Sequence, residues 1–105
     1  MIRHTVVFRL RHPSATAHES DFLRAAEELA SIPGVERFEV LRQVGRKSAF
    51  TFGLSMQFAD EAAYARYNKS PEHERFVQER WVREVEEFLE LDYIPYAEAA
   101  KSREA

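Results

Sequence analysis

The chain has 105 residues, no cysteine and a net charge of −3, with acidic and basic side chains spread along its length. This length suits one domain, and the missing cysteine excludes disulfides, thiolate metal sites and cysteine nucleophiles. With no block of like charges and no apolar run near membrane-spanning length, we expect a cytoplasmic protein that binds neither nucleic acid nor membrane.

The first predicted element is a strand over residues 2–10, in which apolar and polar side chains alternate. One face of this strand carries Ile2, His4, Val6, Phe8 and Leu10. A helix should follow, because Thr16 and Glu19 have capping-box spacing and apolar residues then recur with helical period up to Ile32. We expect Glu19 on the solvent side of this helix, and Pro33-Gly34 at its end.

The middle of the chain predicts a β-hairpin. Residues 35–44 and 50–58 both have strand character, and the second segment alternates Phe, Leu and Met with small or polar residues. Gly45 to Ser48 lie between them and should form the turn.

A broken helix and a last strand complete the predicted order. Asp60 is a plausible N-cap for a short helix, and Ser70-Pro71 should interrupt it, because proline disfavours helical geometry in the residue before it. A second helical stretch follows, and residues 88–94 alternate as a strand. The polar tail, residues 97–105, is expected to fray.

The order β-α-β-β-α-β predicts an α+β, ferredoxin-like domain, in which a four-stranded antiparallel sheet carries both helices on one face. The opposite face would then be uncovered and partly apolar. Such a face favours a partner, so we expect a homodimer that pairs through the open sheet faces into a dimeric α+β barrel.

Three segments resemble the stress-responsive A/B barrel (Dabb) family. They are the first strand, Met1 to Leu10, the block Tyr67 to Phe76, and the ending Leu91 to Pro95. The most specific part is the Tyr-x-x-x-Pro-x-His element within the second segment. The resemblance covers about residues 1–96, which we take as one domain followed by the tail.

The resemblance implies a homodimeric barrel and a set of site residues. The best understood members resemble a plant polyketide cyclase, which closes a poly-β-ketone by aldol condensation with no metal or organic cofactor. By motif position His73 would be the acid/base, Tyr67 would polarise a carbonyl, and Asp92 would orient the histidine. First-strand positions that line the family's pocket are matched by His4, Val6 and Phe8, and we add Trp81 as a further substrate-binding candidate.

Elementary chemistry permits these roles, but each residue could also have a purely structural role. An imidazole such as that of His73 can remove an α-proton near neutral pH, but a histidine in the first turn of a helix can also serve the backbone. His4 lies in an apolar row, so it needs either a buried partner or a cavity. Tyr67 could equally be a core aromatic, and Asp92 a solvent-facing strand residue. The set His4, His73 and Asp92 could hold a metal, but nothing in the spacing demands one, and we expect none.

Three functions remain open at this point. The first is a cofactor-free enzyme that acts on a small hydrophobic carbonyl compound by His/Tyr acid-base chemistry. The second is a non-catalytic barrel that binds a small apolar ligand or serves as a stress-related assembly protein. The third is a cofactor-free monooxygenase of the related barrel type, which the Tyr-x-x-x-Pro-x-His element disfavours.

Overall fold

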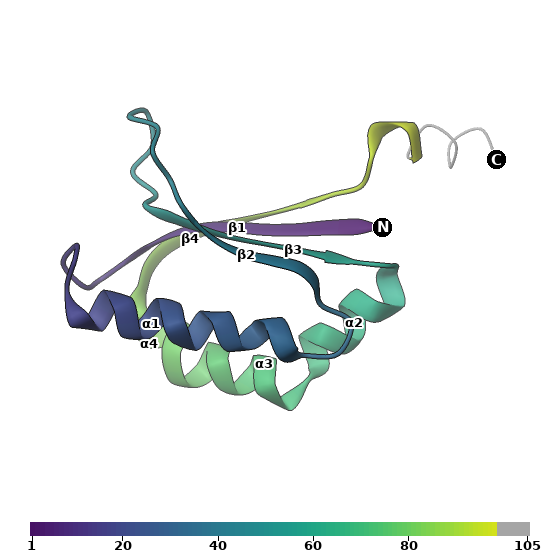
Figure 1. Cartoon of the computed structure of the whole chain (residues 1–105), viewed down its shortest axis with the longest axis horizontal. Helices are drawn as coiled ribbons and strands as arrows, with labels where there is room; N and C mark the ends of the chain where they lie inside the picture. Colours follow the sequence, from purple (N-terminus) through teal and green to yellow (C-terminus); the bar gives the residue numbers. More distant parts are fainter. Residues whose placement is uncertain (99–105) are drawn as a thin grey trace.

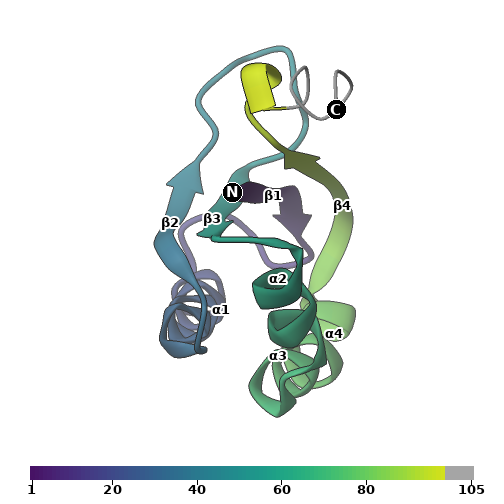
Figure 2. The same ribbon diagram turned by 90° about the vertical axis from the view of Figure 1, so that its right-hand side faces the viewer.

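The computed structural model describes residues 1–98, which form a four-stranded antiparallel sheet with its helices on one side (Figures 1 and 2). The strands are β1 (Ile2–Leu10), β2 (Glu36–Arg42), β3 (Phe52–Phe58) and β4 (Val85–Tyr93), in the spatial order β2-β3-β1-β4. This order is the ferredoxin-like arrangement, so the predicted fold class is confirmed. Of the predicted tail, residues 99–105 lie outside the described part of the chain.

The first helix begins with a shifted form of the predicted capping box. Thr16 Oγ accepts a hydrogen bond from the Glu19 amide at 3.4 Å, while the Glu19 carboxylate accepts from the Ala15 amide at 2.9 Å. Helix α1 (Ala17–Glu27) then tightens into η1 (Glu28–Ser31). The prediction that Glu19 faces solvent is wrong, because its carboxylate is buried under the loop whose backbone it satisfies.

The predicted helix break is confirmed. Helix α2 (Glu61–Lys69) begins at Asp60, whose carboxylate accepts from the Ala63 amide at 2.9 Å. Helix α3 (Pro71–Phe76) begins at Ser70, whose hydroxyl accepts from the His73 amide at 3.2 Å. Each start therefore has a side chain that satisfies an amide left free by the helix.

Beyond α3 the helix widens before the chain enters the sheet. Segment η2 (Val77–Trp81) is a π-helical turn, in which the Val82 amide bonds to the Val77 carbonyl five residues back. A short α4 (Val82–Glu84) follows, and β4 starts at Val85, earlier than the predicted residue 88. Single π turns of this kind are frequent at functional sites.

The core lies between the sheet and the helices. Alternate residues of β1 and β3 point into it and meet aromatic side chains from α1, α2 and α3, the largest buried ones being Phe8, Phe22, Met56, Phe58 and Tyr67. Full burial of each such side chain contributes roughly 1.5–3 kcal/mol. No helix in the part of the chain described here is long and apolar enough to cross a membrane.

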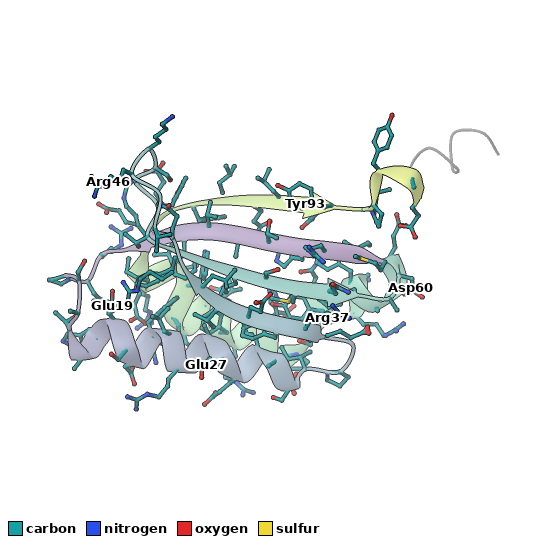
Figure 3. All side chains as sticks on the ribbon, turned by 45° about the horizontal axis from the view of Figure 1, so that its top comes forward. Glu19, Glu27, Arg37, Arg46, Asp60 and Tyr93 are labelled. Carbon is teal, nitrogen blue, oxygen red and sulfur yellow. The ribbon has the colours of Figure 1, made fainter. Side chains whose placement is uncertain are left out.

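The other face of the sheet is uncovered. In the register of β1 with β4, Val7 pairs with Leu89 and Thr5 with Leu91, and both leucines are exposed. The connection between β2 and β3 is longer than the predicted turn and rises on this side, with Arg46 at its far end (Figures 1 and 3).

Candidate functional site

A cavity of about 290 Å³ lies between the sheet and the α2–α4 segment. Its wall comes from both layers of the fold. The apolar part consists of Val6, Leu29, Leu54, Met56, Phe76, Val77, Trp81 and Phe88. The polar part consists of His4, Tyr64, Tyr67, Asn68, His73 and Glu90. An apolar pocket with a few convergent polar groups is the usual form of a small-molecule site.

His73 is a cavity residue whose ring nitrogen Nδ1 lacks a hydrogen-bond partner among the described residues. Its Nδ1 is shielded from solvent and unpartnered, and its ring centroid lies 4.5 Å from that of Tyr67. Burial lowers the pKa of His73, and nearby His4 lowers it further, while the backbone carbonyl of Asn68 and the carboxylate of Glu90 act in the opposite direction. The ring is therefore held neutral, which is the state a general base needs.

Tyr67 places a phenol beside that base. The side chain is only 2% exposed, and its hydroxyl has no hydrogen bond within residues 1–98. Burial raises the pKa of Tyr67 well above its usual range, with a smaller contribution from the Glu90 carboxylate. The hydroxyl stays protonated, so it can donate to an oxygen on which negative charge develops.

His4, Tyr64 and Asp92 form a bonded group at one end of the cavity. Asp92 lies directly opposite His4 in the β1–β4 register, and its Oδ1 is 2.6 Å from His4 Nδ1. The Tyr64 hydroxyl donates to Asp92 Oδ2 at 2.9 Å and lies 2.9 Å from the same His4 nitrogen. Burial raises the pKa of Tyr64, and its hydrogen bond to Asp92 raises it further, so this phenol also stays protonated.

This geometry corrects one prediction. Asp92 was expected to orient His73, but both oxygens of its carboxylate are bonded to other groups, and within the described residues no hydrogen bond joins it to His73. The reason is topological, since Asp92 faces His4 across neighbouring strands while His73 lies on a helix below them. The histidine that Asp92 orients is His4, through Nδ1.

The remaining predicted pocket residues divide between wall and support. Val6 and Trp81 line the cavity, and their contact with a substrate stays a prediction. Phe8 does not; it is fully buried behind Trp81, with the two ring centroids 5.0 Å apart. Among residues 1–98, no group of three or more potential metal-ligating side chains is close enough to hold an ion.

Three polar cavity residues were missed by sequence reasoning. Tyr64 precedes Tyr67 by three positions and so shares its helix face, which the helical period predicts. Glu90 precedes Asp92 by two positions and so shares its strand face. Asn68 acts through its backbone carbonyl beside the helix break, for which the side-chain pattern holds no signal.

The structure resembles several solved structures along almost its whole length. A Dabb family protein with a ferredoxin-like fold from Mesorhizobium loti is 56% identical, with a TM-score of 0.89 over 90% of this chain and 95% of that one. A hydroxynitrile lyase from Passiflora edulis is 20% identical (TM-score 0.78; 90% and 92% covered), and a dimeric ferredoxin-like protein from Thermobifida fusca is 17% identical (TM-score 0.74; 90% and 90%). At these lower identities the likeness extends to the fold alone. A search of curated proteins found no match.

The sequence and the fold agree on the family. The model of the stress responsive A/B barrel domain matches residues 2–95, which include all four strands and every cavity residue. The chain therefore belongs to the stress responsive A/B barrel (Dabb) family.

Proposed function

We propose that this protein is a cofactor-free enzyme that forms or breaks a carbon–carbon bond next to a carbonyl group of a small hydrophobic compound, in the manner of a polyketide cyclase. One observation carries the proposal: His73, neutral and with an unpartnered Nδ1, lies in an apolar cavity beside the free hydroxyl of Tyr67. Enolate chemistry needs a base that removes a proton and a donor that stabilises the enolate oxygen, and these two groups can supply both.

In the bond-forming direction, His73 removes a proton from the carbon next to a ketone. Nε2 is the nitrogen assigned to this transfer, because Nδ1 is shielded. The electron pair moves onto the ketone oxygen, where Tyr67 donates a hydrogen bond to the enolate. The enolate carbon then attacks a second carbonyl of the same molecule, and the resulting alkoxide takes the proton back from His73.

His4 has a positioning role in this scheme. In the tautomer whose Nδ1–H donates a hydrogen bond to Asp92, the lone pair of this cavity-lining ring is on Nε2. That lone pair can accept a hydrogen bond from a substrate hydroxyl. The cavity then holds a donor, Tyr67, and two imidazoles among apolar side chains.

Cyanohydrin cleavage is a second candidate within the same chemistry. It is favoured by the fold likeness to the Passiflora edulis hydroxynitrile lyase. Here the base removes the hydroxyl proton, the bond to the nitrile carbon breaks, a carbonyl forms, and cyanide leaves with the proton from the imidazolium. The same neutral His73 serves both reactions.

The test is turnover with one substrate for each direction of the chemistry. Mandelonitrile reports cleavage by the release of benzaldehyde, and an aromatic β-hydroxyketone reports retro-aldol cleavage. We expect turnover of at least one above the buffer rate, with loss in His73→Ala. Equal rates in the wild type and His73→Ala would contradict the proposal. Saturable binding with no turnover would instead support the non-catalytic ligand-binding alternative.

The proposed assembly is a homodimer that pairs the open sheet faces. The support is the exposed apolar row of Leu41, Leu89, Leu91 and Tyr93 on that face, and the dimeric state of the Thermobifida fusca protein of the same fold. Because the cavity lies on the other side of the sheet, this dimer leaves it open to ligands.

Sedimentation at micromolar concentration tests this assembly. We expect about twice the 12.3 kDa chain mass for the wild type. Leu91→Lys should give monomers, since it places a charge at the apolar centre of the face. The matched control is Val82→Lys, an exposed apolar residue on the helical side, which should remain dimeric. A wild-type monomer would refute the pairing.

A further inference from the structure

We propose that Glu90 selects the charge of the ligand: the cavity takes a small compound carrying a protonated amine and discriminates against carboxylates. This inference rests on the proposed function, since it names the substrate class of the same cavity. Glu90 lies on β4, whereas the acid-base residues Tyr67 and His73 lie on α2 and α3.

The position of Glu90 follows from the sheet. It is paired with Val6 in the β1–β4 register, two residues before Asp92 on the face that looks towards the helices. β4 is an edge strand, and the Glu90 side chain is exposed while also lining the cavity. The carboxylate therefore lies on the outer rim of the cavity.

The charge of Glu90 is not balanced by a partner. Two other acidic residues of β4, Glu86 and Glu87, are bound to Arg9 at 3.1 and 2.6 Å. Glu90 has no hydrogen bond or salt bridge with any residue from 1 to 98, and the cavity wall contains no lysine or arginine. Its charge acts on the interior, since it adds to the raised pKa of Tyr67 and opposes the lowering of the His73 pKa by burial.

The neighbours of Glu90 suit a cation. Trp81 and Phe88 meet edge to face at the cavity wall, with ring centroids 5.5 Å apart. Aromatic rings attract an ammonium group, and a carboxylate beside them adds a charge-assisted hydrogen bond. A ligand carboxylate would instead face an unpaired negative charge in a partly water-excluded space, where repulsion is stronger than in water.

Trp81 supplies the readout, because it is the single tryptophan of the chain and lines the cavity. We would titrate the protein at neutral pH with benzylamine, benzyl alcohol and benzoate, which share one ring and differ in charge. We expect benzylamine to bind most tightly and benzoate most weakly, with a ratio of roughly three- to tenfold between them at low salt.

Two substitutions assign the preference to Glu90. Glu90→Gln should bring benzylamine and benzoate to equal affinity, and Glu90→Lys should reverse their order. The matched control is Glu27→Gln, which removes the same charge from an exposed position of α1 (Figure 3) and should preserve the wild-type ratio. A charge preference that persists in Glu90→Gln, or three probes that leave the Trp81 fluorescence unchanged, would overturn the proposal.

Failure here is distinguishable from failure of the proposed chemistry. If turnover depends on His73 but the probes bind without regard to charge, the proposed chemistry is supported and the proposed role of Glu90 is rejected. If the charge preference is lost in Glu90→Gln but His73→Ala keeps the full turnover rate, the proposed ligand class is supported and the proposed chemistry is rejected.

Discussion

His4 and His73 line the same cavity but differ in the hydrogen bonding of their Nδ1 atoms. His4 lies on β1, is 7% exposed, and has its Nδ1 bonded within a group that includes Asp92 and Tyr64. His73 lies on α3 with a shielded and unpartnered Nδ1 and a lowered pKa. The contrast teaches that sharing a pocket does not imply sharing a role: one imidazole is held by the fold and the other is left available.

The hydrogen bonding of the two histidines also has different consequences for the stability of the fold. A buried polar atom without a partner destabilises a protein by roughly 1–3 kcal/mol, so such atoms are rare and concentrate at functional sites. His73 is the only described residue with a shielded, unpartnered side-chain nitrogen or oxygen. The fold tolerates this loss at His73 and avoids it at His4.

The largest expected effect is on turnover. His73→Leu should lower the rate by roughly 10²–10⁴-fold, because it removes the general base. The free energy of unfolding should stay the same or rise, since an apolar side chain removes the unsatisfied nitrogen. Turnover and urea denaturation on the same variant measure both.

A companion variant is Tyr67→Phe, which keeps the buried ring and removes only the proposed oxyanion donor. It should also lower the rate, by less than His73→Leu. A His73→Leu protein that is clearly less stable but turns over normally per folded molecule would show that His73 is structural.

The second effect is on stability. His4→Ala should reduce the free energy of unfolding by roughly 2–4 kcal/mol, because it leaves the Asp92 carboxylate without one partner and opens a hole in the core. Urea denaturation measures the loss. If His4→Ala instead remains as stable as the wild type and loses turnover as strongly as His73→Leu, the two histidines act together and the division between them disappears.

The element order and the helix starts could be predicted from the sequence, because these features are local. Asp60 and Ser70 determine where helices begin, because each side chain accepts from an amide three residues ahead, and Pro71 suits the first helical position. The alternation in β1 and β3 similarly determines which residues form the core face. Each of these signals is complete within about ten residues of chain.

The partner of Asp92 could not be predicted in the same way. His4 and Asp92 are 88 positions apart, and their contact depends on the register between two strands that no short segment specifies. The π turn before β4 and the earlier start of that strand were missed for a related reason: they adjust packing against the sheet, which residue type alone does not encode. The family resemblance assigned Asp92 to His73, whereas the structure bonds it to His4.

A third test uses pH. Burial lowers the pKa of His73 in the folded state below the value of about 6.5 expected in the unfolded chain. Below that pH the unfolded chain binds a proton that the folded chain resists, so stability should be complete above about pH 6.5 and decrease as the pH falls. The slope of unfolding free energy between pH 7 and 5 should be smaller in His73→Leu. An unchanged slope would show that His73 is not held neutral.

The smallest effect concerns a third histidine, His12, which is bonded as His4 is but lies outside the cavity. Its Nε2 is 2.7 Å from Glu84, which also binds Arg80. This contact leaves His12 only partly exposed.

Burial alone would raise the pKa of Glu84, but hydrogen bonds from Arg80 and His12 outweigh it and hold the pKa below its usual value. Glu84 therefore contributes stability above an unfolded-state pKa of about 4.3, and this contribution is lost as the pH falls through the lower folded-state value. Glu84→Gln should destabilise the protein at neutral pH by less than about 1 kcal/mol, since the group is near the surface, and by less still in strong acid. Turnover should not change, because the cluster does not line the cavity. Altered turnover with normal stability in Glu84→Gln would mean that a hydrogen-bonded histidine outside the cavity also affects the reaction. Hydrogen bonding would then not separate structural histidines from catalytic ones, as the comparison of His4 with His73 suggests.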